Sequence, residues 1–226
     1  MNMPATNNAT AYGRLTQAFQ FARKCAGDAR ELIKLQQIAL VAGQAERELG
    51  LQFGGLKHYG RILFLTGDSE QHLPVYQSTP LLPWWRFLRE ANLSRGLRFI
   101  DLGSGLLKAC AVARMHFKDV TGCELNPVVA ARSVKVRDRL GMKDLRIMNR
   151  DFFGEDFTLN EYDVVYAYYP FYLNYEELMY RRLMGTKPGT KIILCNGNPP
   201  PNSQFRYLNA TYYPRHGTFF HMYEKT

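Results

Sequence analysis

The sequence predicts an α/β fold: a doubly wound, mostly parallel seven-strand sheet with a C-terminal antiparallel hairpin and an N-terminal helical extension. From residue 97, short apolar strand patterns alternate with helical patterns, and such alternation produces a parallel sheet with helices on both faces. At the chain end, two aromatic and β-branched runs, 205–212 and 218–223, are joined only by Pro214-Arg215-His216-Gly217. A connection that short requires an antiparallel pair.

Before the sheet, the pattern is helical and then irregular. Asp28 is the expected N-cap of an amphipathic helix whose apolar period continues until Gly50. Residues 50–82 are rich in glycine and turn formers, with one strand candidate at 61–65, and they predict a connecting arm. A short helix is expected at 84–91, after a proline.

The remaining elements belong to the sheet and its helices. We therefore expect an N-terminal extension over residues 1–75 and one domain over residues 76–226. The expected strands are 97–102, 119–123, 145–148, 162–167 and 191–195, and the expected helices are 106–117, 127–139 and 175–184.

Composition and charge narrow the function classes. The chain has 226 residues, of which 46% are hydrophobic, enough for one α/β core. A net charge of +9 favours an anionic partner such as RNA, or a membrane surface. The longest apolar run, 164–173, is too short to span a membrane. Four scattered cysteines without a CxxC pair predict no disulfide framework and no metal site, and they favour a reducing compartment.

The first 27 residues contain no acid and carry Arg14, Arg23 and Lys24 among scattered apolar residues. Mitochondrial transit peptides have this composition, so we expect a mitochondrial protein. The alternative is an ordinary flexible tail on a cytoplasmic protein.

The first chemical motif is the turn that follows the strand at 97–102. Its residues Asp101, Gly103, Ser104 and Gly105 place a carboxylate and a glycine-rich bend before a helix. Glycines let the backbone approach a ligand closely. A plain strand-to-helix turn and a nucleotide-binding loop are alternatives, but no phosphate-binding lysine follows, which excludes a P-loop.

Two further motifs follow at the next strand ends. Glu124 ends the second strand, where an acid can accept hydrogen bonds from both hydroxyls of a ribose. Asp151 and Phe152 follow the third strand, where an acid can accept from an adenine amine and an aromatic ring can cover the base. Asp151 alone would be interpreted as a cap or turn residue, but the three motifs together predict adenosine binding.

With these motifs, the sequence resembles the class I S-adenosylmethionine-dependent methyltransferases over about residues 76–226. It is most similar to the small protein-lysine methyltransferases that modify the ATP synthase c subunit and the adenine nucleotide translocase, with a fainter similarity to the non-SET histone lysine enzyme. The residues that carry the resemblance are Tyr76 with Thr79-Pro80, the run 101–105, the run 122–127 and the fourth strand 164–170.

The resemblance implies S-adenosyl-L-methionine as the cofactor. The run from Asp101 to Gly105 would hold its methionine part, Glu124 its ribose, and Asp151 with Phe152 its adenine. Tyr168 and Phe171, in the corner after the fourth strand, would be the catalytic residues and would face the acceptor amine. The alternative for this corner is a buried aromatic cluster at a strand end.

The sequence departs from the family pattern in the cofactor turn. Leu106 and Leu107 stand where a polar residue and a third glycine are usual, so bulk near the cofactor would weaken or abolish binding. The sequence shows no counterpart of the membrane-anchoring segment typical of the eukaryotic lysine branch, so we do not expect the membrane substrates of that branch. Methylation of an adenine amine needs a side-chain amide at the end of the fourth strand, and the run Tyr168-Tyr169-Pro170-Phe171 has none. The run 198–201 has an asparagine followed by prolines, but it follows the fifth strand and is expected to form a rigid loop.

These features together predict a methyltransferase that modifies a protein lysine side chain. The alternatives are a catalytically degenerate methyltransferase-like factor that binds RNA or a ribonucleoprotein particle, and an active RNA methyltransferase. The expected partner is correspondingly a protein substrate or a ribonucleoprotein particle.

Overall fold

The computed structural model describes residues 8–51, 78–168, 173–197 and 204–226, with the side chains from residue 27 onward except those of 173–176. The chain forms two compact units, Met1–Gln37 and Ile38–Thr226. The second unit contains the sheet and the candidate site. No helix in the described ranges is long and apolar enough to cross a membrane.

The second unit is built on a seven-strand sheet with the order β3-β2-β1-β4-β5-β7-β6, which confirms the predicted fold class. All strand pairs are parallel except β5–β7 and β6–β7. The hairpin turn is a 3₁₀ turn over Pro214–His216 closed by Gly217, which has a φ of 57°. The strands are β1 (Arg98–Leu102), β2 (Asp119–Glu124), β3 (Arg146–Asn149), β4 (Val164–Tyr168), β5 (Lys191–Cys195), β6 (Phe205–Tyr213) and β7 (Thr218–Lys225).

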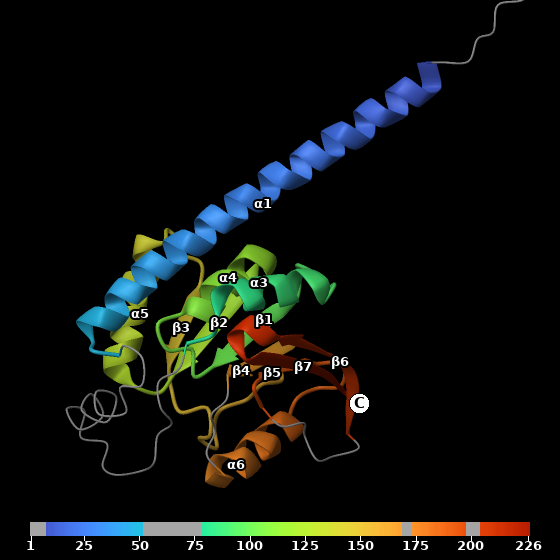
Figure 1. Ribbon diagram of the computed structural model, residues 1–226. Coiled ribbons are helices and arrows are strands. Elements are labelled where there is room, and N and C mark those ends of the chain that lie inside the picture. Colours follow the sequence, from blue (N-terminus) through green and yellow to red (C-terminus); the bar gives the residue numbers. More distant parts are fainter. Residues whose placement is uncertain (1–7, 52–77, 169–172, 198–203) are drawn as a thin grey trace, which may run out of the picture. The chain divides into compact units, whose positions relative to one another are not determined.

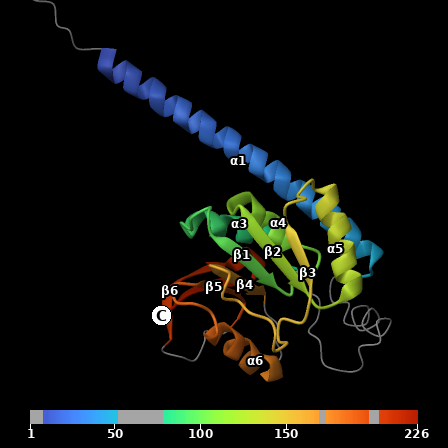
Figure 2. The ribbon, with the colours of Figure 1, turned by 180° about the vertical axis from the view of Figure 1, so that it is seen from behind.

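Helices lie on both faces of this sheet. Helices α3 (Leu81–Glu90) and α4 (Lys108–His116) lie on one face and α6 (Leu173–Met184) on the other, while α5 (Pro127–Arg139) joins β2 to β3 (Figures 1 and 2). Helix α3 begins earlier than the predicted 84–91. Its first turn includes Pro83, because the first N–H groups of a helix need no intrahelical acceptor.

Helix α1 (Asn8–Glu48) is much longer than the sequence predicts. The predicted N-cap at Asp28 is wrong, since this residue lies inside the helix. No proline interrupts residues 8–48, and alanine, leucine, glutamine and arginine give the earlier residues a high helix propensity without an amphipathic period. The predicted end is confirmed, because Gly50 follows with a φ of 68°.

The last turns of α1 belong to the same compact unit as the sheet. The Glu46 carboxylate accepts a hydrogen bond from Ser78 Oγ at 2.6 Å and pairs with Lys108 Nζ at 2.7 Å. An apolar cluster lies beside this pair and includes the cofactor-turn residue Leu106. Its buried members are Ala42, Ala45, Leu51, Leu106, Val129 and Val136. The predicted domain boundary at 75/76 lies outside the described residues and stays a prediction.

An aromatic core fixes the sheet against α3. The Trp84 ring lies 4.4 Å from that of Tyr166, and its Nε1 donates to the backbone oxygen of Ala109 at 3.0 Å. Tyr166 OH and Thr79 Oγ1 share a buried hydrogen bond of 2.7 Å. Thr79 therefore anchors the entry to α3 on β4.

The Glu46 pair gives a test of how firmly the end of α1 is attached. Both side chains of the Glu46–Lys108 pair are less than one fifth exposed, so removing one partner leaves a poorly solvated charge. We expect Glu46→Ala to lower the free energy of unfolding by about 2 kcal/mol in urea titrations. Glu48→Ala, whose pair with Arg132 is more exposed, is the matched control and should cost less than about 1 kcal/mol. Equal losses from the two variants would contradict the attachment.

Candidate cofactor site

The candidate site lies at the carboxyl ends of β1 and β2, which are adjacent parallel strands. Asp101 pairs with Gly122 in the register. Beyond β1 the chain turns back onto β2, because the backbone N–H groups of Gly103 and Ser104 both donate to the backbone oxygen of Cys123 at 2.9 Å. Ligands of open α/β sheets bind at this edge of the strands.

Glycine is required at three positions for this turn. Gly103 and Gly105 have φ angles of 78° and 50°, in the left-handed region that other residues rarely adopt. A Cβ on Gly122 would lie 2.7 Å from Ser104 Oγ and 2.8 Å from Leu107 Cδ2. The turn can therefore lie against β2 only because the middle of that strand has no side chain.

The two bulky residues that the sequence places in the turn, Leu106 and Leu107, are both buried. Leu106 belongs to the apolar cluster with the end of α1, and Leu107 packs against Gly122. Leu107 has a φ of 64°, which costs roughly 1–2 kcal/mol, and burial of its side chain contributes a similar amount in the opposite sense.

Glu124 connects the two turns of the site. Its Oε2 accepts from the N–H of Gly105 at 2.8 Å and its Oε1 from the N–H of Asn126 at 2.9 Å. Burial raises the pKa of this carboxyl, and the backbone N–H groups oppose the rise. A carboxylate accepts about four hydrogen bonds, and the backbone N–H groups of Gly105, Leu125 and Asn126 use up to three of them, so capacity for at least one hydroxyl donor remains.

Two asparagines hold Glu124 in place. Asn126 caps α5 by accepting from the N–H groups of Val128 and Val129. Asn149, at the end of β3, donates from Nδ2 to the backbone oxygens of Glu124 and Leu125, both at 2.8 Å. The turn after β2 is therefore fixed from both neighbouring elements.

Two buried polar atoms beside these turns have no hydrogen-bond partner within the described ranges. They are Asn126 Nδ2, next to Glu124, and Ser104 Oγ, next to Gly122. Buried polar groups are normally satisfied by hydrogen bonds. The unpaired donor at Asn126 and the spare capacity of Glu124 fit a hydroxyl-bearing ligand at this edge.

Asp101 is buried, and its side chain contacts helix α4. Its Oδ2 accepts from Cys110 Sγ at 3.3 Å. Burial raises the pKa of Asp101 to about 7, the Cys110 hydrogen bond lowers it, and the charge of Glu124 raises it. A cationic group placed nearby would favour the ionised form of Asp101.

The predicted adenine pair and acceptor corner are only partly described. The Asp151 carboxylate accepts from the N–H of Phe153 at 2.8 Å, as in a turn, and Phe152 packs in the core on the α6 face of the sheet. Tyr168 is half-buried. Burial raises its pKa, and a hydrogen bond with Asn196 opposes that rise. Phe171, Tyr76 and the loop 198–201 lie outside the described residues.

Sequence reasoning missed Cys110 and Asn149. No sequence signal marks Cys110, which lies on α4 and donates a hydrogen bond to Asp101 on β1. Asn149 stands in the run before Asp151, but only the parallel pairing of β2 with β3 brings it to Glu124. Among the described residues, no group of three His, Cys, Asp or Glu side chains could hold a metal ion.

Comparison with known proteins gives matches in structure only. No protein-family profile matches the chain, and no curated protein sequence does. An RNA methyltransferase from Salinibacter ruber in complex with S-adenosyl-L-homocysteine is similar with a TM-score of 0.54 and 20% identity, over 66% of this chain and 94% of that one. TrmN from Thermus thermophilus has the same TM-score at 18% identity, over 66% and 50% of the chains.

A ribosomal protein L11 methylase from Lactobacillus delbrueckii subsp. bulgaricus is similar with a TM-score of 0.53 and 11% identity, over 70% of this chain and 91% of that one. These likenesses and the strand order show that the chain has the Rossmann-like methyltransferase fold.

The raised pKa of Asp101 predicts how stability changes with pH. The folded chain binds a proton on Asp101 up to about pH 7, whereas the unfolded chain loses it near 3.8. Stability therefore decreases as pH rises from about 4 to 7, by up to roughly 4 kcal/mol from this group. In urea unfolding at pH 5 and pH 8, Asp101→Asn should lose less stability between the two conditions than the wild type. Parallel losses in both proteins would show that Asp101 is ionised throughout.

Proposed function

We propose that this protein is an S-adenosyl-L-methionine-dependent methyltransferase whose cofactor lies across the ends of β1 and β2. The observation that carries the proposal is the geometry of Glu124, whose two oxygens are fixed by backbone N–H groups of the turns after β1 and β2 and retain capacity for at least one hydroxyl donor. The strand order supports it, because β2 ends one strand away from the glycine turn.

The residues of the site have separate roles in this proposal. Glu124 accepts from the ribose hydroxyls, and the unpaired Nδ2 of Asn126 offers a donor beside them. Asp101 would lie on the side of the methionine part, and the ammonium group of the methionine would favour the ionised form of this carboxyl. When bound, S-adenosylmethionine supplies a methyl group on a sulfonium. The protein aligns the acceptor with that group and needs no strong acid or base.

We further propose a protein lysine side chain as the acceptor, on the resemblance of the fourth strand and its corner at Tyr168 to the lysine-modifying branch. The neutral amine nitrogen attacks the methyl carbon as the carbon–sulfur bond breaks, which leaves S-adenosylhomocysteine and a methylated ammonium that returns a proton to solvent. Tyr168, half-buried at the end of β4, would border the amine.

Calorimetric titration with S-adenosylmethionine and S-adenosylhomocysteine tests the cofactor site. We expect micromolar binding by the wild type and at least a tenfold loss in Glu124→Ala, since charged hydrogen bonds contribute about 1.5–3 kcal/mol each. Glu161→Ala removes an exposed acid that pairs with Arg98 and is the matched control. Unchanged affinity in Glu124→Ala would refute the assignment, and no binding by the folded wild type would favour a degenerate binding factor.

A labelled methyl group identifies the acceptor. The full-length protein is incubated with a cell extract and methyl-labelled S-adenosylmethionine, and the products are digested with ribonuclease or protease. We expect label in methylated lysine after complete hydrolysis of the protein fraction, and none with Glu124→Ala. Label in nucleotides instead would show that the acceptor is RNA.

A further inference from the structure

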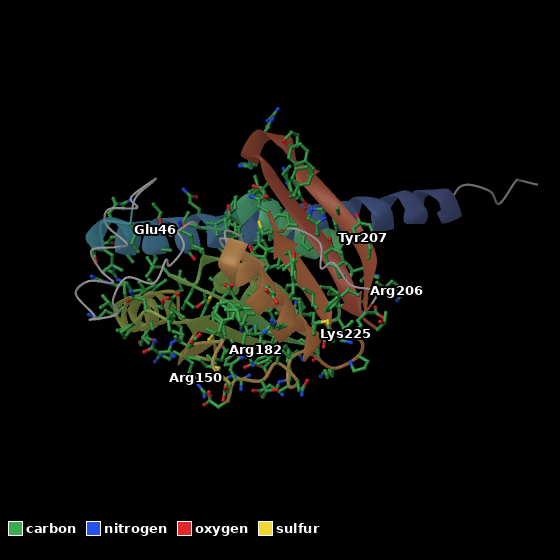
Figure 3. All side chains as sticks on the ribbon, turned by 90° about the horizontal axis from the view of Figure 1, so that it is seen from below. Glu46, Arg150, Arg182, Arg206, Tyr207 and Lys225 are labelled. Atoms are coloured by element: carbon green, nitrogen blue, oxygen red, sulfur yellow. The ribbon has the colours of Figure 1, made fainter. Side chains whose placement is uncertain are left out.

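The hairpin of β6 and β7 exposes large aromatic side chains on one face. Tyr207 and Tyr212 of β6 are 55% and 49% exposed, and Phe219 of β7 is 42% exposed. Every exposed large apolar residue of this hairpin is therefore a ring and none is aliphatic. Figure 3 labels Tyr207 on β6, the outermost strand of the sheet.

These rings form a continuous row with His221 and Tyr223, which we call the aromatic row. The rings of Tyr212 and Phe219 stack at 4.1 Å with an interplanar angle of 17°. Along β7, Phe219 stacks with His221 at 5.9 Å, and His221 with Tyr223 at 6.3 Å. Tyr207 meets Tyr223 edge-on at 5.6 Å. Burial lowers the pKa of His221, which favours the neutral ring.

The fold itself does not explain the exposure of the outer rings of this row, Tyr207, Tyr212 and Phe219. On the opposite face of β7, Phe220 and Met222 are buried in the core. On the row's own face, the apolar cluster beneath α6 includes Tyr223 but not Tyr212 or Phe219. The core is therefore complete without the outer rings, and exposed aromatic surface of this kind marks an interaction site.

Charge favours a nucleic acid as the occupant. The whole chain carries +9. The hairpin segment 204–226 has three cations and the single acid Glu224, but Arg206 pairs with that acid and Lys225 is buried, which leaves Arg215 as its exposed cation. Arg215 is exposed in the turn that follows the strand end bearing Tyr212. Exposed rings beside cations are the combination by which proteins hold unpaired bases and the phosphates between them.

The row begins at the edge of the sheet that carries the candidate site. Phe219 exchanges two hydrogen bonds with Asn196: its N–H donates to Asn196 Oδ1 at 2.7 Å, and its backbone oxygen accepts from the Asn196 N–H at 2.8 Å. Asn196 is also hydrogen-bonded to Tyr168, at the end of β4. Two strand spacings, roughly 10 Å, separate Tyr168 from the start of the row.

We propose that the aromatic row is a stacking surface for the unpaired bases of a single-stranded nucleic acid. The bases stack on Tyr212, Phe219 and Tyr207, and Arg215 contacts the phosphates. This surface is separate from the cofactor site, so it holds a strand in place whether the methyl acceptor is a base or a lysine of a nucleic acid-bound protein.

Fluorescence anisotropy of the full-length protein with a short fluorescein-labelled oligouridylate tests the proposal. We expect saturable binding, weakened roughly tenfold by Phe219→Ala and further in the double variant with Tyr212→Ala, because base stacking on a ring contributes about one decade of affinity. Tyr212→Phe keeps the ring and should bind like the wild type. A duplex of the same length, whose bases are already stacked, should bind more weakly.

Leu178→Ala, which removes an exposed aliphatic side chain from α6, is the matched control and should leave binding unchanged. Binding of S-adenosylmethionine and the thermal midpoint should be unaffected in all these variants, so loss of the row is distinguishable from loss of the cofactor site or of the fold. Oligonucleotide affinity that is absent in the wild type, or equal in the double variant, would overturn the proposal. A dimer in sedimentation that the double variant converts to monomer would instead assign the row to a second copy of the chain.

Discussion

The carboxylate of Glu124 is the contact on which the rest of the candidate site depends. It accepts backbone N–H groups from the turn after β1 and from the turn after β2, and so joins the two turns directly. Asn149 fixes the same turn from β3. A carboxylate is suited to this position because two oxygens with about four acceptor sites can hold the backbone and still meet a ligand.

This arrangement requires two buried acids on adjacent strands, and their charges repel. Burial raises the pKa of both Asp101 and Glu124, and the charge of Glu124 contributes to the rise at Asp101. The two groups differ in what opposes burial. Glu124 receives backbone N–H groups, whereas Asp101 receives the weak thiol donor Cys110. Asp101 is therefore the group whose charge state a bound cation can change most.

The sequence predicted the sheet well because its strands and helices alternate with clear periods, and both ends of β5 and α5 were predicted to the residue. The start of α1 was missed because residues 8–27 favour a helix by propensity alone, without the apolar period by which a surface helix is recognised. Neither the left-handed backbone of Leu107 nor the burial of its side chain could be foreseen, since both depend on the close approach to Gly122.

The same limits apply to the candidate site. Glu124 was identifiable because a strand-end acid in the second βα unit has a fixed topological place. Cys110 and Asn149 were not, because their contacts with Asp101 and Glu124 arise only when neighbouring elements pack together. The Asp151 carboxylate accepts a hydrogen bond within a turn and Phe152 packs in the core, and their proposed adenine contacts stay a prediction.

The backbone edge of the β6–β7 hairpin is interrupted, whereas one face of the same hairpin exposes aromatic rings. Strand β6 is one of the two edge strands of the sheet, and a long edge strand invites pairing with another chain. A register shift between Tyr207 and Asn209 and the exposed charge of Arg206 interrupt that edge. The face of the same hairpin carries exposed stacked rings. A structure that protects its backbone edge while leaving aromatic faces accessible is consistent with a partner that binds through rings rather than through strand addition.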